Sequence, residues 1–121
     1  MDNKCILIVD DDEDFLRVMK FNISKLGYEV LTSFTAEEAK EIISRQLPNL
    51  VLLDIMLPAK SGYRFCWEIK NDDKLKTIPI VFISAKGAER DKAMGKSMGA
   101  DAYLAKPFTM QELEETLKKY L

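Results

Sequence analysis

The sequence predicts a doubly wound α/β fold: a five-stranded parallel sheet in the order 2-1-3-4-5, covered by helices on both faces in three layers, α/β/α. Two observations support this fold. Short runs of Val, Ile and Leu without polar alternation are typical of strands buried on both faces. These runs alternate with segments whose apolar residues recur at helical spacing, which predicts five strand and helix pairs, (βα)5. Connections between parallel strands of one sheet are expected to be right-handed crossovers.

The first half of the chain contains two strand and helix pairs. The apolar run Cys5–Val9 predicts the first strand, and the helix after it stops at Gly27, a residue type that commonly ends helices. A mixed, β-rich segment at residues 28–34 predicts the second strand, and Thr35 with Glu38 forms a capping-box pattern for the second helix. The expected inward faces are Leu16, Met19, Ile23 and Leu26, then Ala36, Ala39 and Ile43.

Three further pairs follow in the second half. The third, fourth and fifth strands are expected at residues 50–53, 78–83 and 101–105. A weaker helical stretch runs from Glu89 to near Gly99, and Thr109 with Glu112 forms another capping box at the start of the last helix. The expected inward residues are Phe65, Cys66 and Ile69 in the third helix, and Met110, Leu113 and Leu117 in the last.

Length and composition bound the class of protein. At 121 residues, 47% hydrophobic and 31% charged, the chain is expected to form a single domain, 1–121, with an ordinary core. No apolar run is long enough to span a membrane and the amino terminus lacks a secretory pattern, so we expect a cytoplasmic protein. Cys5 and Cys66 lie in apolar stretches and are expected as buried, reduced thiols.

Charge and residue usage exclude several functions. The 18 basic and 20 acidic residues are dispersed and sum to −2, so we expect no direct binding of nucleic acid. The sequence contains no histidine, which excludes imidazole-dependent catalysis and phosphohistidine chemistry within the chain. Any histidine in the mechanism must therefore belong to a partner.

Four predicted strands end at their carboxyl side in side chains suited to phosphate or metal chemistry. They are Asp10, Asp11 and Asp12 after the first, Asp54 after the third, Ser84 after the fourth and Lys106 after the fifth. The carboxyl ends of parallel strands share one edge, where such folds bind ligands, so these groups should meet in one pocket. Asp10, Asp11 and Asp54 offer the hard oxygen ligands that Mg²⁺ prefers, and a divalent cation would relieve their repulsion.

One carboxylate of this cluster can act as a nucleophile toward phosphorus. Carboxylates accept phosphoryl groups in some enzymes, a metal screens the incoming charge, and Lys106 and Ser84 can contact two phosphoryl oxygens. Each residue also has a plainer interpretation. Asp12 to Asp14 suit a helix amino terminus, Asp54 a turn before Pro58, Ser84 a cap, and Lys106 a solvated surface. Only their joint placement favours a site.

A calcium loop running from Asp10 through Asp12 and Asp14 does not fit the sequence. Phe15 stands where such a loop needs glycine, and Phe21 stands where it needs a bidentate glutamate.

In these motifs the chain resembles the receiver domains of two-component response regulators, such as the chemotaxis regulator, over essentially all 121 residues. The motifs are Ile6–Asp12 (Ile-Leu-Ile-Val-Asp-Asp-Asp), Leu52–Pro58 (Leu-Leu-Asp-Ile-Met-Leu-Pro) followed by Gly62, Ile83–Ala85 (Ile-Ser-Ala) and Lys106–Phe108 (Lys-Pro-Phe). The resemblance implies a flavodoxin-like fold. It also implies that Asp54 is the phosphoacceptor, that Asp11 binds Mg²⁺ directly while Asp10 assists through water, and that the Met56 backbone carbonyl is a further ligand.

The resemblance also implies a conformational switch. Ser84 matches the switch hydroxyl, Lys106 the lysine that pairs with the phosphoryl group, and Tyr103 the aromatic switch residue, while the Lys106–Pro107 bond would be cis. The residues alone leave a second interpretation of Tyr103, as a β-favouring aromatic on an edge strand. A phosphoryl group adds charge and acceptor oxygens, which can draw the hydroxyl and the lysine into new contacts.

Three functions follow from the sequence. The first is a signalling module that takes a phosphoryl group from a sensor histidine kinase or a phosphotransfer protein onto Asp54 and catalyses only its own modification. The second is a phosphohydrolase of the haloacid dehalogenase type with Asp10 as nucleophile and Asp12 as acid, although Asp14 departs from that pattern. The third is an adaptor that keeps the fold without phosphorylation.

The expected partners are proteins. The 121 residues end directly after the last predicted helix, so we expect the signal to reach a separate effector or a linked output domain outside these residues. The domain itself is expected as a monomer, or as a weak dimer on phosphorylation. No motif identifies the kinase or the target.

Overall fold

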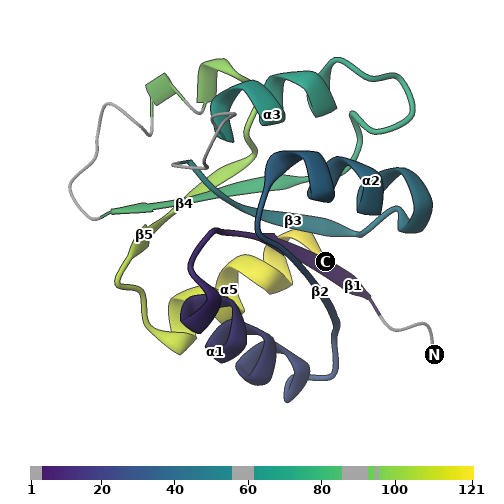
Figure 1. The fold of residues 1–121 in the computed structure, drawn as a ribbon. Coiled ribbons are helices and arrows are strands. Elements are labelled where there is room, and N and C mark those ends of the chain that lie inside the picture. The colour runs from purple at the N-terminus through teal and green to yellow at the C-terminus, as the bar shows by residue number, and fades with distance from the viewer. Residues whose placement is uncertain (1–3, 56–61, 86–92, 95) are drawn as a thin grey trace.

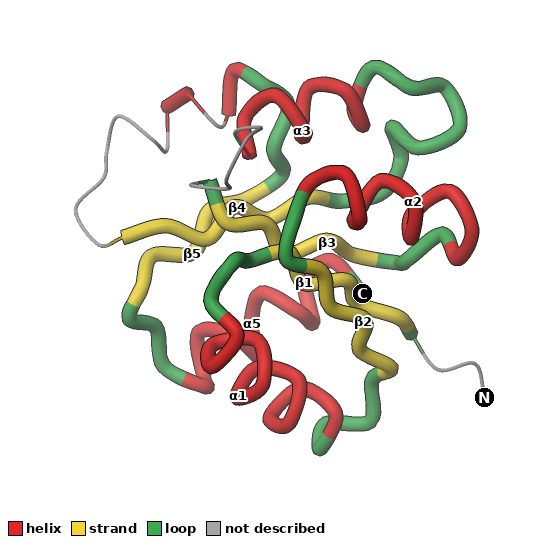
Figure 2. The backbone as a smooth tube through the Cα atoms, in the orientation of Figure 1, coloured by secondary structure: helices red, strands yellow, loops and turns green. Residues whose placement is uncertain are grey.

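Five parallel strands form one sheet in the order β2-β1-β3-β4-β5, which confirms the predicted fold class (Figure 2). The structure is a computed structural model, and it describes residues 4–55, 62–85, 93, 94 and 96–121. The strands are β1 (Cys5–Val9), β2 (Glu29–Ser33), β3 (Leu50–Asp54), β4 (Ile80–Ala85) and β5 (Ala102–Lys106).

Helices cover both faces of the sheet. They are α1 (Glu13–Ser24), α2 (Ala36–Gln46), α3 (Gly62–Lys70) and α5 (Met110–Tyr120). Helices α1 and α5 lie on one face, and α2 and α3 lie on the other (Figure 1). Successive strand residues alternate between the two layers: Ile6 and Ile8 pack with α1 and α5, whereas Leu7 and Val9 pack with α2 and α3. All four side chains are buried, because a parallel sheet of this kind has no solvent face.

The helices begin where the sequence offers caps. The Asp12 side chain accepts hydrogen bonds from the N–H groups of Asp14 and Phe15 at the start of α1. The Thr109 hydroxyl accepts from the Glu112 N–H while the Glu112 carboxylate accepts from the Thr109 N–H, which is the predicted capping box of α5. Such caps satisfy amide groups that the helix itself leaves without partners.

Two residues predicted to face the core do not do so. Leu26 is exposed, because α1 ends at Ser24 and the chain turns through Gly27 at φ +98°. Met110 is exposed because it is the first residue of α5, before the helix reaches the sheet. The other predicted inward residues of α1, α2, α3 and α5 are buried. Cys66 is fully buried, but Cys5 is only partly so.

The predicted helix from Glu89 falls largely outside the described residues. Residues 93, 94, 96 and 97 are helical, and the chain leaves this segment at Gly99 with φ +99°. Within the described part of the chain, we find no helix with the length and apolar character needed to cross a membrane.

Candidate functional site: an acidic pocket at the carboxyl edge of the sheet

The fold brings the predicted acidic residues together. Asp10 follows β1 directly and Asp54 is the last residue of the neighbouring strand β3, since β1 and β3 are paired in register. Asp10, Asp11 and Asp54 each place a carboxylate oxygen within 4.8 Å of the others. Asp10 and Asp54 are buried and Asp11 is exposed, so the cluster opens to solvent on the side of Asp11. Three carboxylates at this separation repel one another unless a cation joins them.

Both carboxylate oxygens of Asp10 are already bonded within the protein. Oδ1 accepts from the Asp12 N–H at 2.9 Å, and Oδ2 lies 3.0 Å from the Lys106 ammonium. The Asp10 side chain is 2% exposed, whereas that of Lys106 is 31% exposed. A buried carboxylate needs such partners, because desolvation of an unpaired charge is costly. Asp10 is therefore held in place rather than free to act as a nucleophile.

Asp54 and Ser84 lie on adjacent strands and are both buried. Helix α3 approaches the end of β3 closely: the Gly62 N–H donates to the Ile55 carbonyl at 2.9 Å. A Cβ atom on Gly62 would lie 2.6 Å from the Asp54 carbonyl oxygen, closer than side chains tolerate. Glycine at position 62 is thus required for this approach to the backbone that carries Asp54.

Lys106 reaches the cluster from the end of β5. The peptide bond between Lys106 and Pro107 is cis, the isomer that the resemblance implied. The Lys106 ammonium lies 4.0 Å from the centroid of the Phe15 ring, in addition to its contact with Asp10. The Phe15 ring in turn meets Phe108 edge to face, with centroids 6.3 Å apart and an interplanar angle of 86°.

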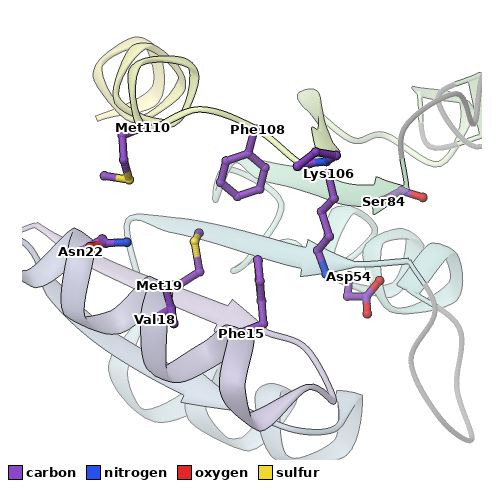
Figure 3. Close-up of a pocket in the computed structure, with 10 residues that line it drawn as sticks. Phe15, Val18, Met19, Asn22, Asp54, Ser84, Lys106, Phe108 and Met110 are labelled. Atoms are coloured by element: carbon purple, nitrogen blue, oxygen red, sulfur yellow. The ribbon is translucent and has the colours of Figure 1, made fainter.

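Asp54, Ser84 and Lys106 line one end of a groove of about 830 Å³ between α1 and the start of α5. Figure 3 shows these three polar side chains at the strand ends, with the rings of Phe15 and Phe108 beside them. The rest of the groove is apolar, apart from Asn22, and is lined by Val18, Met19, Pro107 and Met110. The polar groups therefore lie at one end of a mostly apolar groove.

Several predicted residues lie elsewhere. Asp12 caps α1 and is not part of the carboxylate cluster. Tyr103 is half-buried on β5, opposite Phe82 of β4, and packs against the core layer that contains α2 and α3. Met56, whose carbonyl the resemblance implied as a metal ligand, lies outside the described residues.

Sequence reasoning did not identify Phe15 as part of the site. Its ring contacts Lys106, a residue 91 positions later in the chain (106 minus 15). A signal did exist, because Phe15 directly follows the acidic run at residues 10–14 and so lies at the same sheet edge as Lys106. Helical periodicity gave no indication that the ring would lie against the ammonium rather than in the core.

The donor set decides what the pocket can bind. Its ligating atoms are carboxylate oxygens, without imidazole or thiolate among the clustered residues, and this suits a hard divalent cation such as Mg²⁺. The ammonium and hydroxyl nearby suit oxygen atoms of a phosphoryl group. Doubly wound α/β domains bind their ligands at the carboxyl ends of the strands, where the strand order reverses. In this domain the order reverses between β1 and β3, next to Asp10 and Asp54.

Comparison with known proteins assigns the family. The model of the response regulator receiver domain matches residues 6–118. The chain therefore belongs to the response regulator receiver family of two-component signalling, whose members are signalling modules rather than classical enzymes.

Individual relatives agree with this assignment. The chain is 39% identical over 121 residues to the "Probable transcriptional regulator ycf27" of Cyanophora paradoxa, which covers all of this chain and 49% of that protein. The chain thus spans about half the length of this curated relative. The chemotaxis protein CheY4 of Vibrio cholerae has a TM-score of 0.92 at 26% identity, covering 99% of this chain and 100% of that one. The BeF3-activated receiver domain of Klebsiella pneumoniae RstA has a TM-score of 0.89 at 28% identity, covering 97% of each chain.

Proposed function

We propose that this chain is a phosphorylatable receiver in which Asp54 accepts a phosphoryl group from a phosphohistidine of a sensor histidine kinase or phosphotransfer protein. The observation that carries the proposal is the cluster itself: three carboxylates within 4.8 Å, with the Lys106 ammonium 3.0 Å from one of them. Asp54 is the member that also shares the groove with Ser84 and Lys106, which supports its assignment as the phosphoacceptor.

A carboxylate oxygen of Asp54 forms a bond to phosphorus while the phosphorus–nitrogen bond of the donor breaks, and the imidazole nitrogen keeps the electron pair and takes up a proton. Water later cleaves the acyl phosphate, which returns the carboxylate and releases inorganic phosphate. Because these 121 residues contain no histidine, the donor imidazole lies outside them.

The residues fit a magnesium site. Both carboxylate oxygens of Asp10 are engaged, by the Asp12 N–H and by the Lys106 ammonium, and Asp11 is exposed, so we assign Asp11 and Asp54 as direct ligands and Asp10 as an indirect one acting through water. Bound Mg²⁺ would supply charge neutralisation for the carboxylates and for the phosphoryl oxygens. The Met56 carbonyl completes the proposed ligand set.

The proposed switch uses side chains on β4 and β5. A phosphoryl group on Asp54 adds roughly −1.5 to −2 charge and three acceptor oxygens. The Ser84 hydroxyl and the Lys106 ammonium would each turn toward one of them, because both line the same groove. Tyr103 lies two residues before Ala105, the β5 residue that pairs with Ser84. When the Ser84 hydroxyl turns toward the phosphoryl group, the Tyr103 ring would move into the space that the hydroxyl leaves.

The output of the switch is also proposed. An effector protein, or an output domain linked to these 121 residues in a longer chain, would read the changed surface, with the domain itself a monomer or a weak dimer when phosphorylated. The name of the ycf27 relative, a transcriptional regulator twice as long, favours a linked output domain. The receiver would then act as one domain, residues 1–121, without touching nucleic acid.

One rival is the haloacid dehalogenase type of phosphohydrolase, which would use Asp10 as nucleophile and Asp12 as acid. Two contacts argue against it. The oxygens of Asp10 are bonded to Lys106 and to the Asp12 N–H, and the Asp12 carboxylate accepts from the first amides of α1. Neither group is placed for that chemistry.

Acetyl phosphate with Mg²⁺ tests the proposal. We expect mass spectrometry to show one added phosphoryl group that hydroxylamine removes, as for an acyl phosphate, and we expect Asp54→Asn to abolish it. Label lost only in Asp10→Asn would favour the phosphohydrolase. An unlabelled natural sequence would favour the adaptor and contradict the proposal.

A further inference from the structure

We propose that Phe15 is a positioning residue for Lys106: the face of its ring retains the ammonium in the pocket while the anionic partner changes from Asp10 to a phosphoryl group on Asp54. The inference rests on the proposed function, because only a phosphorylated Asp54 would give Lys106 a second partner. It adds a residue that the acidic and basic motifs do not include.

The need for such a contact follows from the exposure of Lys106. Its side chain is 31% exposed, and an ammonium on a four-carbon stem is strongly hydrated and rotates freely. One hydrogen bond to Asp10, at 3.0 Å, would be lost whenever the lysine changes partner. The Phe15 ring, 4.0 Å from the ammonium, provides a contact that does not depend on which carboxylate is being neutralised.

An aromatic face suits this task better than a polar side chain. The attraction arises from the quadrupole of the ring, so no N–H group has to point at a particular acceptor atom. The three N–H donors of the ammonium can therefore turn from Asp10 toward a phosphoryl oxygen while the ring contact persists. A carboxylate at position 15 would instead compete with the phosphoryl group for Lys106.

The ring is itself fixed by its neighbours. Phe15 lies in the first turn of α1, where its N–H donates to the capping Asp12 side chain, and it packs against the core layer formed with α1 and α5. Phe108 meets it edge to face, and Phe108 is only two residues from Lys106. The segment that carries the lysine thus also orients the ring that holds it (Figure 3).

The same helix offers a matched control. Phe21 has the Lys25 ammonium 4.9 Å from its ring centroid, but it is 63% exposed and does not line the groove. Phe21→Leu removes a contact of the same chemical kind away from the pocket. Phe15→Leu keeps an apolar side chain of similar size and removes the ring, whereas Phe15→Tyr keeps the ring.

The first experiment measures the rate constant for labelling of Asp54 by acetyl phosphate at saturating Mg²⁺. We expect Phe15→Leu to lower it roughly three- to tenfold, and Phe15→Tyr and Phe21→Leu to leave it within about twofold of the natural sequence. In a Lys106→Met background, Phe15→Leu should have no further effect. Equal rates for Phe15→Leu and the natural sequence, or an equal loss in the Lys106→Met background, would overturn the inference.

A spectroscopic measurement on the unmodified protein does not depend on any variant folding. Protons on the Lys106 ε-carbon, lying over a ring face, should be shifted upfield in the NMR spectrum, and this shift should persist when Mg²⁺ and beryllofluoride are added. Its disappearance on that addition would show that the ammonium leaves the ring, and the inference would fail. Failure of Asp54 to become labelled in the natural sequence would instead refute the proposed function.

Discussion

At the scale of single residues, the described part of the pocket brings three carboxylates together beside the Lys106 ammonium. The Lys106 ammonium lies 3.0 Å from Asp10, and carboxylate oxygens of Asp10, Asp11 and Asp54 lie within 4.8 Å of one another. Their repulsion is a cost of the cation-free state, and binding of a divalent cation would remove it. Stability of the protein should therefore depend on Mg²⁺ through Asp11 and Asp54.

Asp11→Asn tests this dependence, because it removes one charge from the exposed side of the cluster. In EDTA we expect the variant to melt about 2–4 °C higher than the natural sequence, since repulsion is relieved. Added Mg²⁺ should then stabilise the natural sequence by about 2.7 kcal/mol at a hundred times its Kd, and the variant far less. Differential scanning calorimetry with and without the metal measures both effects.

Asp14→Asn is the matched control for that experiment. Asp14 belongs to the same acidic run, but its carboxylate lies 3.7 Å from Arg17 at the surface of α1 and outside the cluster. Loss of the Asp14 carboxylate should leave the stabilisation of the protein by Mg²⁺ unchanged. If Asp14→Asn and Asp11→Asn reduced the stabilisation by Mg²⁺ equally, the cation would bind the acidic run diffusely rather than at the cluster.

The buried Cys66 thiol should make the stability of the protein depend on pH. Burial raises the pKa of the Cys66 thiol to about 11 from its usual value of 9.0. Between these two pKa values the folded protein keeps a proton that the unfolded chain releases. The contribution of the Cys66 thiol to the free energy of unfolding is therefore complete below pH 9 and is lost as the pH rises through 11. The loss amounts to at most about 3 kcal/mol. We expect the stability difference between the natural sequence and Cys66→Ala to shrink by this order between pH 8.5 and pH 11.5 (about half a unit outside the two pKa values).

Urea unfolding at the two pH values measures that difference, and taking it between two variants cancels the titration of lysines and tyrosines. A thiol reagent gives an independent check. At pH 8 the partly exposed Cys5 should react with the native protein, whereas the fully buried Cys66 should react only as fast as the protein unfolds. Rapid reaction of Cys66 would contradict the burial that causes the shift.

At the scale of elements, the junction between β3 and α3 sets the position of Asp54, the proposed phosphoacceptor. Gly62 allows α3 to begin against the backbone of Asp54 and Ile55. Gly62→Ala would force a Cβ to within 2.6 Å of the Asp54 carbonyl oxygen, and overpacking of this kind costs typically 1–3 kcal/mol, about 2 kcal/mol here. We expect lower stability in urea and slower labelling of Asp54 together.

Gly27→Ala separates backbone strain from displacement of the site. Gly27 has φ +98°, which alanine adopts at a cost, but a Cβ there would meet no atom within 4 Å. The variant should lose about 1 kcal/mol of stability and label at the normal rate. Normal labelling of Gly62→Ala at reduced stability would show that α3 moves away without disturbing Asp54.

The elements themselves could be predicted because their periods are strong. The continuous apolar runs at residues 5–9 and 50–53 differ clearly from the helical spacing of Leu16, Met19 and Ile23. The ends were harder to predict, because Leu26 and Met110 continue the apolar pattern of α1 and α5 without reaching the core. Periodicity reports which side of a helix is apolar, but not where the helix stops contacting its neighbours.

At the scale of the whole molecule, the site could be predicted because topology alone brings the strand ends together. Asp10, Asp54, Ser84 and Lys106 lie at or next to the carboxyl ends of four strands that lie side by side in the order β1-β3-β4-β5. The contact between Lys106 and the Phe15 ring could not be predicted, because it depends on side-chain directions across 91 residues (106 minus 15). Strand order thus specifies which residues share an edge, and packing decides which of them touch.

The opposite edge of the sheet contains a different polar cluster, centred on Asp101 just before β5. Its carboxylate lies 2.8 Å from the Lys70 ammonium at the end of α3 and accepts from the Ile80 N–H at the start of β4. Its backbone carbonyl accepts from the Tyr120 hydroxyl at the end of α5. Asp101 therefore connects four elements on both sides of the sheet, far along the strands from Asp54.

Asp101→Asn should lower stability without altering the chemistry of the pocket. Asparagine keeps the shape and can still accept from Ile80, but the charge-assisted contact with Lys70 is lost, so we expect the free energy of unfolding to fall by about 1–3 kcal/mol. Asp73→Asn, which removes a solvent-exposed pair with Lys76, should change nothing measurable. Urea unfolding compares the two variants, and labelling of Asp54 at a temperature where both remain folded should match the natural sequence. Slower labelling in Asp101→Asn alone would mean that the two edges of the sheet are coupled through β4 and β5.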